Sequence, residues 1–560
     1  MKKTKSFKQK LKSFCLLLFV CTYCFASFSY VGWYREGNKM TYVTNEGYKV
    51  ANAWRDSDGM KFFLDENGYV VYDKVFNLNG DIYYVGPNGA RVSNQFVDVT
   101  EDLILGDGVE PGRFYFADDG KAYKKVNNNF IKLINGQKYA FDENGHIFYD
   151  CWLTKDGEYL DGTSDVLNEG HYHVKENGVL SQNEWYDFSF DVAADQDLGE
   201  SNLIALRYGE LAGMWMYFDN KCEKISASGT QSKKLTLNGA EYSFDEHGVM
   251  FLGFQKNRTD IDTHQASNPT LKDRIKYYDK YTGELQKNKW IYDVTPEAFD
   301  ANAYDDGKEY WYYVDGDGAI VKNRIKNISG NKYSFDGLGR LRKGFLLIDG
   351  VTFMGAEYKG EDLSRNDFMY SVAEGSHLYG SDLLDIHYFN ENEGNNEGKM
   401  ITGTVKIELS DGVYEFNFKD SGIAYGNKNE LKLYKNSFYK NGLKFKPWEE
   451  TKYGIVKVSD EEYKLINSSG KIVRGRRKVI KDDYDNFIVL FNDRVAAYIL
   501  QPNRKVKLRW KTFKNVTGYY YYDEDLEKKA YTGLAVASGT TCPTPAQILN
   551  IPNDMKVNFR

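Results

Sequence analysis

The sequence predicts an all-β protein: an elongated solenoid of stacked β-hairpin repeats with irregular loop insertions. Three observations lead to this fold class. Gly47, Gly68 and Gly89 are each 21 residues apart, and Gly318 and Gly339 show the same interval. The chain holds 45 Tyr and 34 Phe, which favour strands, and 51 Gly against 9 Pro. Similar text surrounds each of these glycines, and a short unit copied many times indicates a repeat architecture.

Each unit is interpreted as a β-hairpin centred on its glycine turn. The segment Tyr310–Val314 is rich in strand formers, Asp315–Gly318 forms a turn, and a short apolar stretch follows. Glycine is expected where the turn needs positive φ. A single hairpin is marginal in water, so stacked copies must share a core. Copies of the turn end at Gly68, Gly89, Gly145, Gly248, Gly318 and Gly339.

Alternation along the strand suggests which positions face the core. Residues i and i+2 share one face of a strand. Pairs such as Tyr83/Val85 and Tyr312/Val314 are always apolar, which predicts an inward face. The positions between them vary and are predicted to face outward, as a ligand surface would. The outward aromatics are Phe63, Tyr84, Trp311 and Tyr313.

A large apolar residue follows seven residues after most of the glycines, with Asn or Asp two positions before it. Trp54, Trp152, Trp185 and Trp290 occupy this position, as do Val75, Phe96 and Ile325. These tryptophans could stack on a ligand, or they could fill the gap between hairpins as Val75 must. Both interpretations remain open from the sequence.

The repeats are predicted to cover residues 27–475. Their longest insert, about 346–384, lacks repeat text, and such inserts are candidate contact surfaces. Residues 476–560 are expected to form a C-terminal cap or a small β-module, in which Tyr519–Tyr522 belongs to a strand.

The N-terminus is predicted to be a signal peptide, residues 1–26. Six lysines precede a short apolar region, and Ala26 marks the expected cleavage site. A lipoprotein signal ending at Cys21 is the alternative. Three cysteines remain after cleavage, which is no disulfide framework. No later stretch could span a membrane, so we expect a secreted protein associated with the cell surface.

The composition argues against several other classes of function. A net charge of −7 does not suit a nucleic-acid binder. No nucleophile, metalloprotease or phosphate-loop motif is present, so no catalytic residue, metal or cofactor is predicted. The segments Asp56–Gly59 and Asp315–Gly318 resemble fragments of calcium loops, but both lack the required Glu and are interpreted as turns.

The segment Trp311–Gly318 and the opening Gly32-Trp33 resemble the cell-wall-binding repeats of Gram-positive bacteria. This group includes choline-binding modules and the similar repeats of glucan-binding proteins and clostridial toxins. The resemblance covers about residues 31–475. It implies attachment to teichoic acids or α-glucans. It also implies choline cages, each with two outward aromatics and a Trp from the next hairpin. Most cages are broken here, because Lys138, Glu241 or Lys332 stands where the family has Trp.

We therefore predict an exported, non-catalytic bacterial surface protein that binds cell-wall polysaccharide, teichoic acid or glucan. The alternatives are an adhesin that contacts host glycans or proteins through its inserts, and a cell-wall hydrolase with a C-terminal catalytic module. The predicted ligand-binding residues are Phe63, Tyr84, Phe96, Trp185, Trp290, Trp311 and Tyr313.

Overall fold

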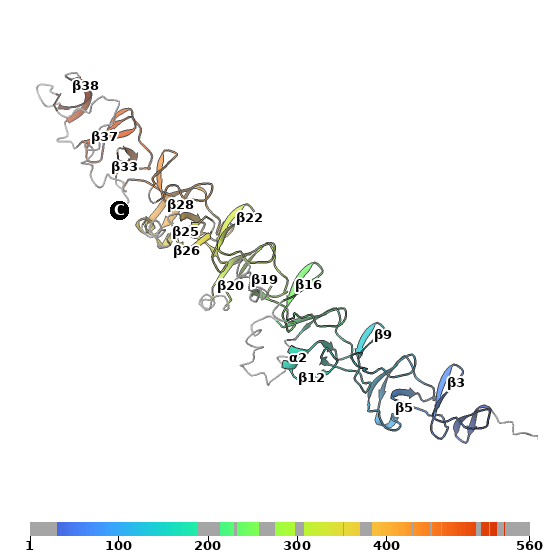
Figure 1. Ribbon diagram of the computed structural model, residues 1–560. Coiled ribbons are helices and arrows are strands. Elements are labelled where there is room, and N and C mark those ends of the chain that lie inside the picture. Colours follow the sequence, from blue (N-terminus) through green and yellow to red (C-terminus); the bar gives the residue numbers. More distant parts are fainter. Residues whose placement is uncertain are drawn as a thin grey trace, which may run out of the picture. The chain divides into compact units, whose positions relative to one another are not determined.

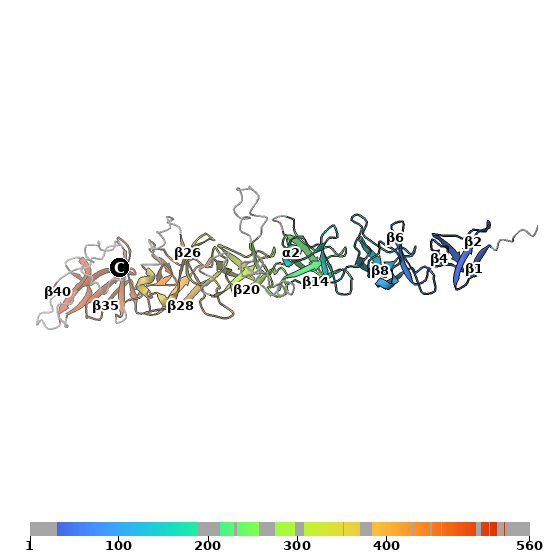
Figure 2. The ribbon, with the colours of Figure 1, turned by 90° about the horizontal axis from the view of Figure 1, so that it is seen from below.

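The chain folds almost entirely into short antiparallel strands, which confirms the all-β prediction (Figures 1 and 2). The computed structural model describes residues 31–188, 213–228, 232–256, 275–296, 307–350, 352–369, 384–427, 430–447, 451–460, 462–499, 506–513, 516–523 and 531–532. The predicted signal peptide lies outside these residues. None of the described helices is long and apolar enough to cross a membrane.

The described residues fall into two compact units. The first holds the residues up to Gly253 together with Tyr278–Glu284, and the second holds Phe254–Lys256, residues 275–277 and those from Leu285 onward. Strands β18 (Gly253–Lys256) and β19 (Ile275–Tyr278) lie at the division.

The first unit is a series of hairpins with one short helix. Helix α2 (Thr163–Glu169) contacts β11 and β12. The strands pair as β1 (Gly32–Glu36) with β2 (Lys39–Val43), β3 (Ala53–Ser57) with β4 (Met60–Leu64), β5 (Lys74–Leu78) with β6 (Asp81–Val85), β7 (Gln95–Val99) with β8 (Gly112–Phe116), β9 (Ile131–Ile134) with β10 (Gln137–Ala140), β11 (Cys151–Leu153) with β12 (Tyr159–Leu160) and β13 (Tyr172–Val174), β14 (Glu184–Asp187) with β15 (Trp215–Phe218), and β16 (Lys233–Leu237) with β17 (Ala240–Phe244).

The second unit continues the hairpins and adds larger sheets. The two-stranded pairs are β20 (Lys289–Val294) with β21 (Glu309–Val314) and β33 (Tyr453–Ser459) with β34 (Glu462–Asn467). The larger sheets are β22 (Arg324–Ile328), β23 (Asn331–Phe335) and β24 (Leu341–Arg342); β25 (Gly344–Asp349), β26 (Thr352–Tyr358) and β27 (Asp385–Phe389); β28 (Gly403–Leu409), β29 (Gly412–Phe418), β30 (Lys432–Tyr434), β31 (Ser437–Lys440) and β32 (Leu443–Lys444); β35 (Arg477–Lys481), β36 (Phe487–Phe491) and β37 (Arg494–Ile499); and β38 (Val506–Phe513), β39 (Val516–Asp523) and β40 (Tyr531–Thr532).

The centre of the hairpin differs from the prediction. Strands β5 and β6 pair from Lys74↔Val85 to Leu78↔Asp81, so the closing turn is Asn79-Gly80. Both turn residues have positive φ, 56° and 90°, which matches the twist of a two-residue hairpin. After the repeated glycine Gly89, Arg91 forms an isolated bridge with Val85 of its own hairpin, and Ala90 forms one with Phe62 of the preceding hairpin. The repeated glycine turn is therefore the link from one hairpin to the next.

The acidic residue of each linking turn organises the turn through its side chain. In the second unit, Asp315 Oδ1 accepts hydrogen bonds from the backbone N–H groups of Asp317 and Ala319, both at 3.0 Å. Gly318 has φ 81°. This is the Asx-turn chemistry that the sequence predicted in place of a calcium loop. The same double acceptance, two and four residues ahead, occurs at Asp65, Asp219, Asp245, Asp336, Asn467 and Asp482.

The Asn or Asp that precedes each large apolar residue also has a backbone role. Asn183 and Asn288 have φ of 51° and 50°. Asn and Asp are the residues other than glycine that enter this left-handed region most readily. The full set is Asn52, Asp73, Asn94, Asp150, Asn183, Asn288 and Asn323.

Within each unit, successive turns stack through one side chain per repeat. A Cβ placed on Gly89 would lie 3.0 Å from Val70, and one on Gly339 would lie 2.4 Å from Ile320. In both cases the contacting residue stands two positions after the preceding turn glycine. The repeated glycine is thus required both by its positive φ and by the close approach of the neighbouring repeat.

The long inserts replace the two-residue turn of their hairpins. The segments between β11 and β13, β14 and β15, β20 and β21, and β25 and β27 all leave from this end of the hairpin. The insert at 346–384 is partly regular, because β26 pairs with β25 and widens the hairpin to three strands. Residues 370–383 lie outside the described part.

The C-terminal segment shares a core with the last repeat that the structure describes. Ile455 and Leu465 of hairpin β33–β34 pack with Ile480, Ile488 and Leu490 of the sheet β35–β36–β37. Such a shared core is what a terminal cap needs. Residues Tyr519–Tyr522 lie in strand β39, as predicted.

Candidate functional site

The predicted outward face is wrong for most hairpins. Phe63, Tyr84 and Tyr313 are only 5%, 9% and 9% exposed. The small residues at equivalent positions, such as Ala140 and Ser334, are buried as well. Both faces of a hairpin are covered because neighbouring hairpins pack against it on either side, so alternation along a strand does not separate core from solvent here.

The tryptophans at the start of the hairpins belong to ring clusters that join neighbouring repeats. In the first unit, Trp185 lies 5.1 Å from its cross-strand partner Tyr217 and 5.1 Å from Tyr242 of the next hairpin. In the second unit, Trp290 lies 5.2 Å from Tyr313 and 4.9 Å from Tyr333. Edge-to-face ring pairs at these distances are typical of stabilising core contacts.

The same cluster recurs at other predicted site residues. Trp54 lies 5.2 Å from both Phe63 and Tyr83. Phe96 lies 4.8 Å from Tyr115 and 5.2 Å from Tyr139. The structure therefore favours gap filling for the residues at this position, and a ligand-binding role for them stays a prediction.

Tyr84 is held differently, because Val75 stands where other repeats have a ring. Its hydroxyl donates to Asp73 Oδ1 at 2.7 Å. Burial, followed by this hydrogen bond, raises the pKa of Tyr84 to about 12. The hydroxyl of Tyr84 is therefore held by a residue of its own repeat.

Of the two neighbouring histidines of the first unit, His173 lies in the core and His171 is half-buried. His173 packs against Trp152 and shares a 2.8 Å hydrogen bond with Ser181 through Nδ1. Burial lowers the pKa of His173 to about 4. No group of ligating side chains suited to a metal occurs among the described residues.

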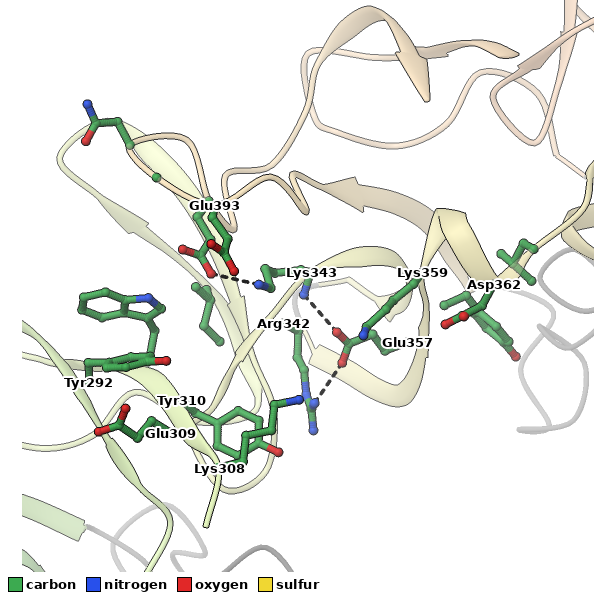
Figure 3. Close-up of a pocket in the computed structure, with 17 residues that line it drawn as sticks. Tyr292, Lys308, Glu309, Tyr310, Arg342, Lys343, Glu357, Lys359, Asp362 and Glu393 are labelled. Carbon is green, nitrogen blue, oxygen red and sulfur yellow. Dashed lines mark hydrogen bonds and ion pairs between the residues drawn. The ribbon is translucent and has the colours of Figure 1, made fainter. Parts of the chain in front are cut away.

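One predicted residue, Trp311, lies at an open site in the second unit. Trp311 on β21 stands opposite Tyr292 on β20, and their ring centroids are 4.8 Å apart with a 44° tilt. Tyr292 is 49% exposed. Both rings line a cavity of about 1020 Å³ that also includes residues of β26 and of the loop after β27 (Figure 3). We call this the ring-pair cavity.

Charged side chains of both signs line the ring-pair cavity. Arg342 contacts Glu357 at 2.9 Å and also contacts Asp336, while Lys343 contacts Glu397 at 2.9 Å (Figure 3). Glu309 and Glu393 line the cavity as well. The cavity thus combines an aromatic platform with polar groups that can orient a ligand, the usual composition of a ligand site.

Tyr292, Glu309 and Glu393 were not predicted as site residues. Tyr292 follows Trp290 by two positions, but a 14-residue segment separates β20 from β21 and hides which residue faces Trp311. Glu393 comes from a loop outside the repeat text. The aromatic pattern Trp290-x-Tyr292 was the one signal available.

Two curated proteins are related to this chain in sequence. Glucosyltransferase-S of Streptococcus mutans serotype c is 25% identical over 346 residues, which cover 57% of this chain and 22% of that protein. Glucosyltransferase-I of Streptococcus downei is 22% identical over 426 residues, covering 70% and 23%. The chain therefore spans less than a quarter of the length of these relatives. No family model matches it.

The comparisons confirm the resemblance to choline- and glucan-binding repeats that the sequence indicated. The relatives share only part of their length with the chain, so their transferase activity is not carried over.

Solved structures of choline- and glucan-binding type repeats align with the chain at low scores. Choline binding protein F from Streptococcus pneumoniae covers 71% of this chain and 99% of its own, with 14% identity and a TM-score of 0.28. The modular autolysin LytC from the same organism covers 59% and 53%, with 16% identity and a TM-score of 0.26.

Proposed function

We propose that the chain is an exported, non-catalytic protein of a bacterial surface that binds cell-wall or extracellular polysaccharide. The carbohydrate-binding type of its repeats supports the ligand class. The predicted signal peptide supports export, and the lack of a catalytic motif in the sequence supports a binding role.

The observation that carries the proposal is the ring pair of Tyr292 and Trp311. The apolar face of a sugar ring can stack on such a platform, while its hydroxyl groups bond to the polar rim. Two adjacent rings on the wall of a cavity of about 1020 Å³ suit an oligosaccharide segment, since this volume is at the upper end for ligand sites. In the clusters around Trp185 and Trp54, each tryptophan packs against a ring of its own hairpin and a ring of the next.

A retention experiment tests the proposal. The chain from Ser27 to Arg560 is applied to purified Gram-positive cell walls and to immobilised dextran, then eluted in turn with choline, soluble dextran and high salt. Retention with elution by dextran is expected. Elution by choline would instead assign the interaction to choline cages, and no retention on either support would overturn the proposal.

A pair of variants locates the site. Y292A/W311A should weaken binding at least about tenfold, because ring contacts of about 1 kcal/mol each are lost. Y48A/Y281A is the matched control, since both tyrosines are exposed and lie outside the cavity. Equal binding by the two double variants would place the ligand elsewhere.

The absence of catalysis is tested on the same polymers. Incubation with cell walls or dextran should release no soluble fragments. Release that a single carboxylate substitution abolishes would favour the hydrolase alternative.

The adhesin alternative places the contact in the inserts, each of which replaces the two-residue turn of its own hairpin. It predicts that binding to host glycans or proteins depends on residues 346–384 and survives Y292A/W311A.

A further inference from the structure

We propose that the ring-pair cavity takes a saccharide that carries free amino groups, with its ammonium groups held by the rings and by the carboxylates of Glu309 and Glu393. This inference rests on the proposed function and names the ligand class of the same site.

The strand register places Glu309 beside the rings. Glu309 stands two residues before Trp311 on β21, so both side chains leave the same face of the hairpin. Tyr292, directly opposite Trp311, shares that face. Both residues line the cavity, and Figure 3 draws Glu309 next to Tyr292.

The second carboxylate comes from a different element. Glu393 belongs to the loop that follows β27 and lies on the other side of Tyr292 from Glu309 (Figure 3). Among the described residues, neither Glu309 nor Glu393 has an ion-pair or hydrogen-bond partner. Both residues are exposed.

The basic residues near the rings are already engaged. Arg342 is held by Asp336 and Glu357, and Lys343 by Glu397. Lys308 lies over the Tyr310 ring at 5.4 Å. Lys359 also lines the cavity, and Figure 3 draws its side chain toward Glu357. The lining holds five carboxylates against four basic side chains, so the balance of charge around the cavity is negative.

The chemistry of these groups selects a cation. An aromatic face attracts an ammonium group through its quadrupole, and the attraction strengthens as the cation is desolvated. Nearby carboxylates accept charge-assisted hydrogen bonds from ammonium groups. A neutral sugar can use the rings but leaves both charges without a counter-ion. A cationic sugar satisfies rings and carboxylates together.

Matched oligosaccharides test the inference on the chain from Ser27 to Arg560. The hexamer of β-1,4-linked glucosamine, the same hexamer fully N-acetylated, and isomaltohexaose are compared by calorimetry at pH 6 and physiological salt. The glucosamine hexamer should bind about tenfold more tightly than its acetylated form. E309Q/E393Q should reduce this ratio to about one while changing the affinity for the acetylated hexamer less than about twofold.

The control separates a specific site from general attraction to an acidic protein. E66Q/E143Q removes two exposed carboxylates from turns of the first unit, outside the cavity, and should leave the tenfold ratio unchanged. A ratio that falls equally in both double variants would overturn the inference. Equal affinity for the two hexamers, with loss in Y292A/W311A, would overturn it while leaving the proposed function intact. No binding of any hexamer would overturn both at this site.

Discussion

Hairpins β14–β15 and β20–β21 are two versions of one repeat, and they differ at one decisive place. Trp185 and Trp290 occupy the same position, with nearly the same surroundings. The distances to the cross-strand tyrosine are 5.1 and 5.2 Å, and those to the next hairpin's phenylalanine are 5.9 Å in both. The interplanar angles of the cross-strand pairs are 68° and 67°.

The difference lies two residues further along each first strand. Trp215 and Trp311 occupy equivalent positions, but Trp215 stands opposite Asp187 whereas Trp311 stands opposite Tyr292. Only the second hairpin therefore presents a ring pair. The comparison teaches that the repeat reproduces the core closely, while a ligand face depends on a single residue outside the repeated pattern.

The largest expected effect concerns the shared core. W185A and W290A should each lower the free energy of unfolding by about 3 kcal/mol, because a large ring is removed from a packed cluster. Urea unfolding with hydrogen exchange would measure the two sites separately. Y48A, at an exposed position, should change stability by less than about 0.5 kcal/mol. A small loss for W290A combined with lost binding would instead show that Trp290 is a ligand residue.

The next largest expected effect is a loss of stability at low pH, which a buried histidine should cause in each unit. Burial lowers the pKa of both His173 and His387 to about 4. Their contribution to stability is complete above the unfolded pKa near 6.5 and is lost as the pH falls toward 4, by at most about 3 kcal/mol each. Unfolding measured from pH 7.5 to pH 4 should show acid lability in both units.

Substitution should distinguish the two histidines. Nδ1 of His387 is buried without a hydrogen-bond partner in the described part of the chain, so H387L should remove the acid lability of the second unit at little cost at pH 7.5. The lability of the first unit, which depends on His173, should remain. H173L should cost more at pH 7.5, because Ser181 Oγ loses its 2.8 Å partner. Acid lability of the second unit that persists in H387L would contradict this account.

The smallest expected effect comes from adding a ring pair to hairpin β14–β15. D187Y places a ring opposite Trp215 and should raise retention on the polysaccharide by a few-fold, since one aromatic pair contributes about 0.5–1.5 kcal/mol. D187N is the control, because it removes the charge without adding a ring. An equal gain from D187N would attribute the effect to charge.

Much of the fold could be predicted because residues within each repeat determine its local backbone conformation. Glycine at the turn, Asp three residues before it, and Asn before the apolar residue each report a backbone conformation that few residues adopt. The position of the hairpin turn was missed, because Asn79-Gly80 occurs in only some copies whereas the linking glycine recurs in nearly all. The linking glycine, which recurs more regularly, marks the connection between two hairpins and not the turn within one.

The candidate site was less predictable. Trp311 was identified from its resemblance to a cage residue, but Phe63, Tyr84 and Tyr313 were expected outside and lie inside. Period-2 alternation assumes that one strand face meets water. In a stack of hairpins, both strand faces contact protein. The alternation of residues along a strand therefore does not predict which side chains are exposed.

The sequence by itself determined the repeat, its strands and its turns, because these follow from local conformation and from text shared between copies. The tertiary structure decided which aromatic rings remain open. That choice depends on cross-strand register across a 14-residue segment and on Glu393 from a loop beyond the hairpin. Contacts between residues far apart in the chain leave no periodic trace in it.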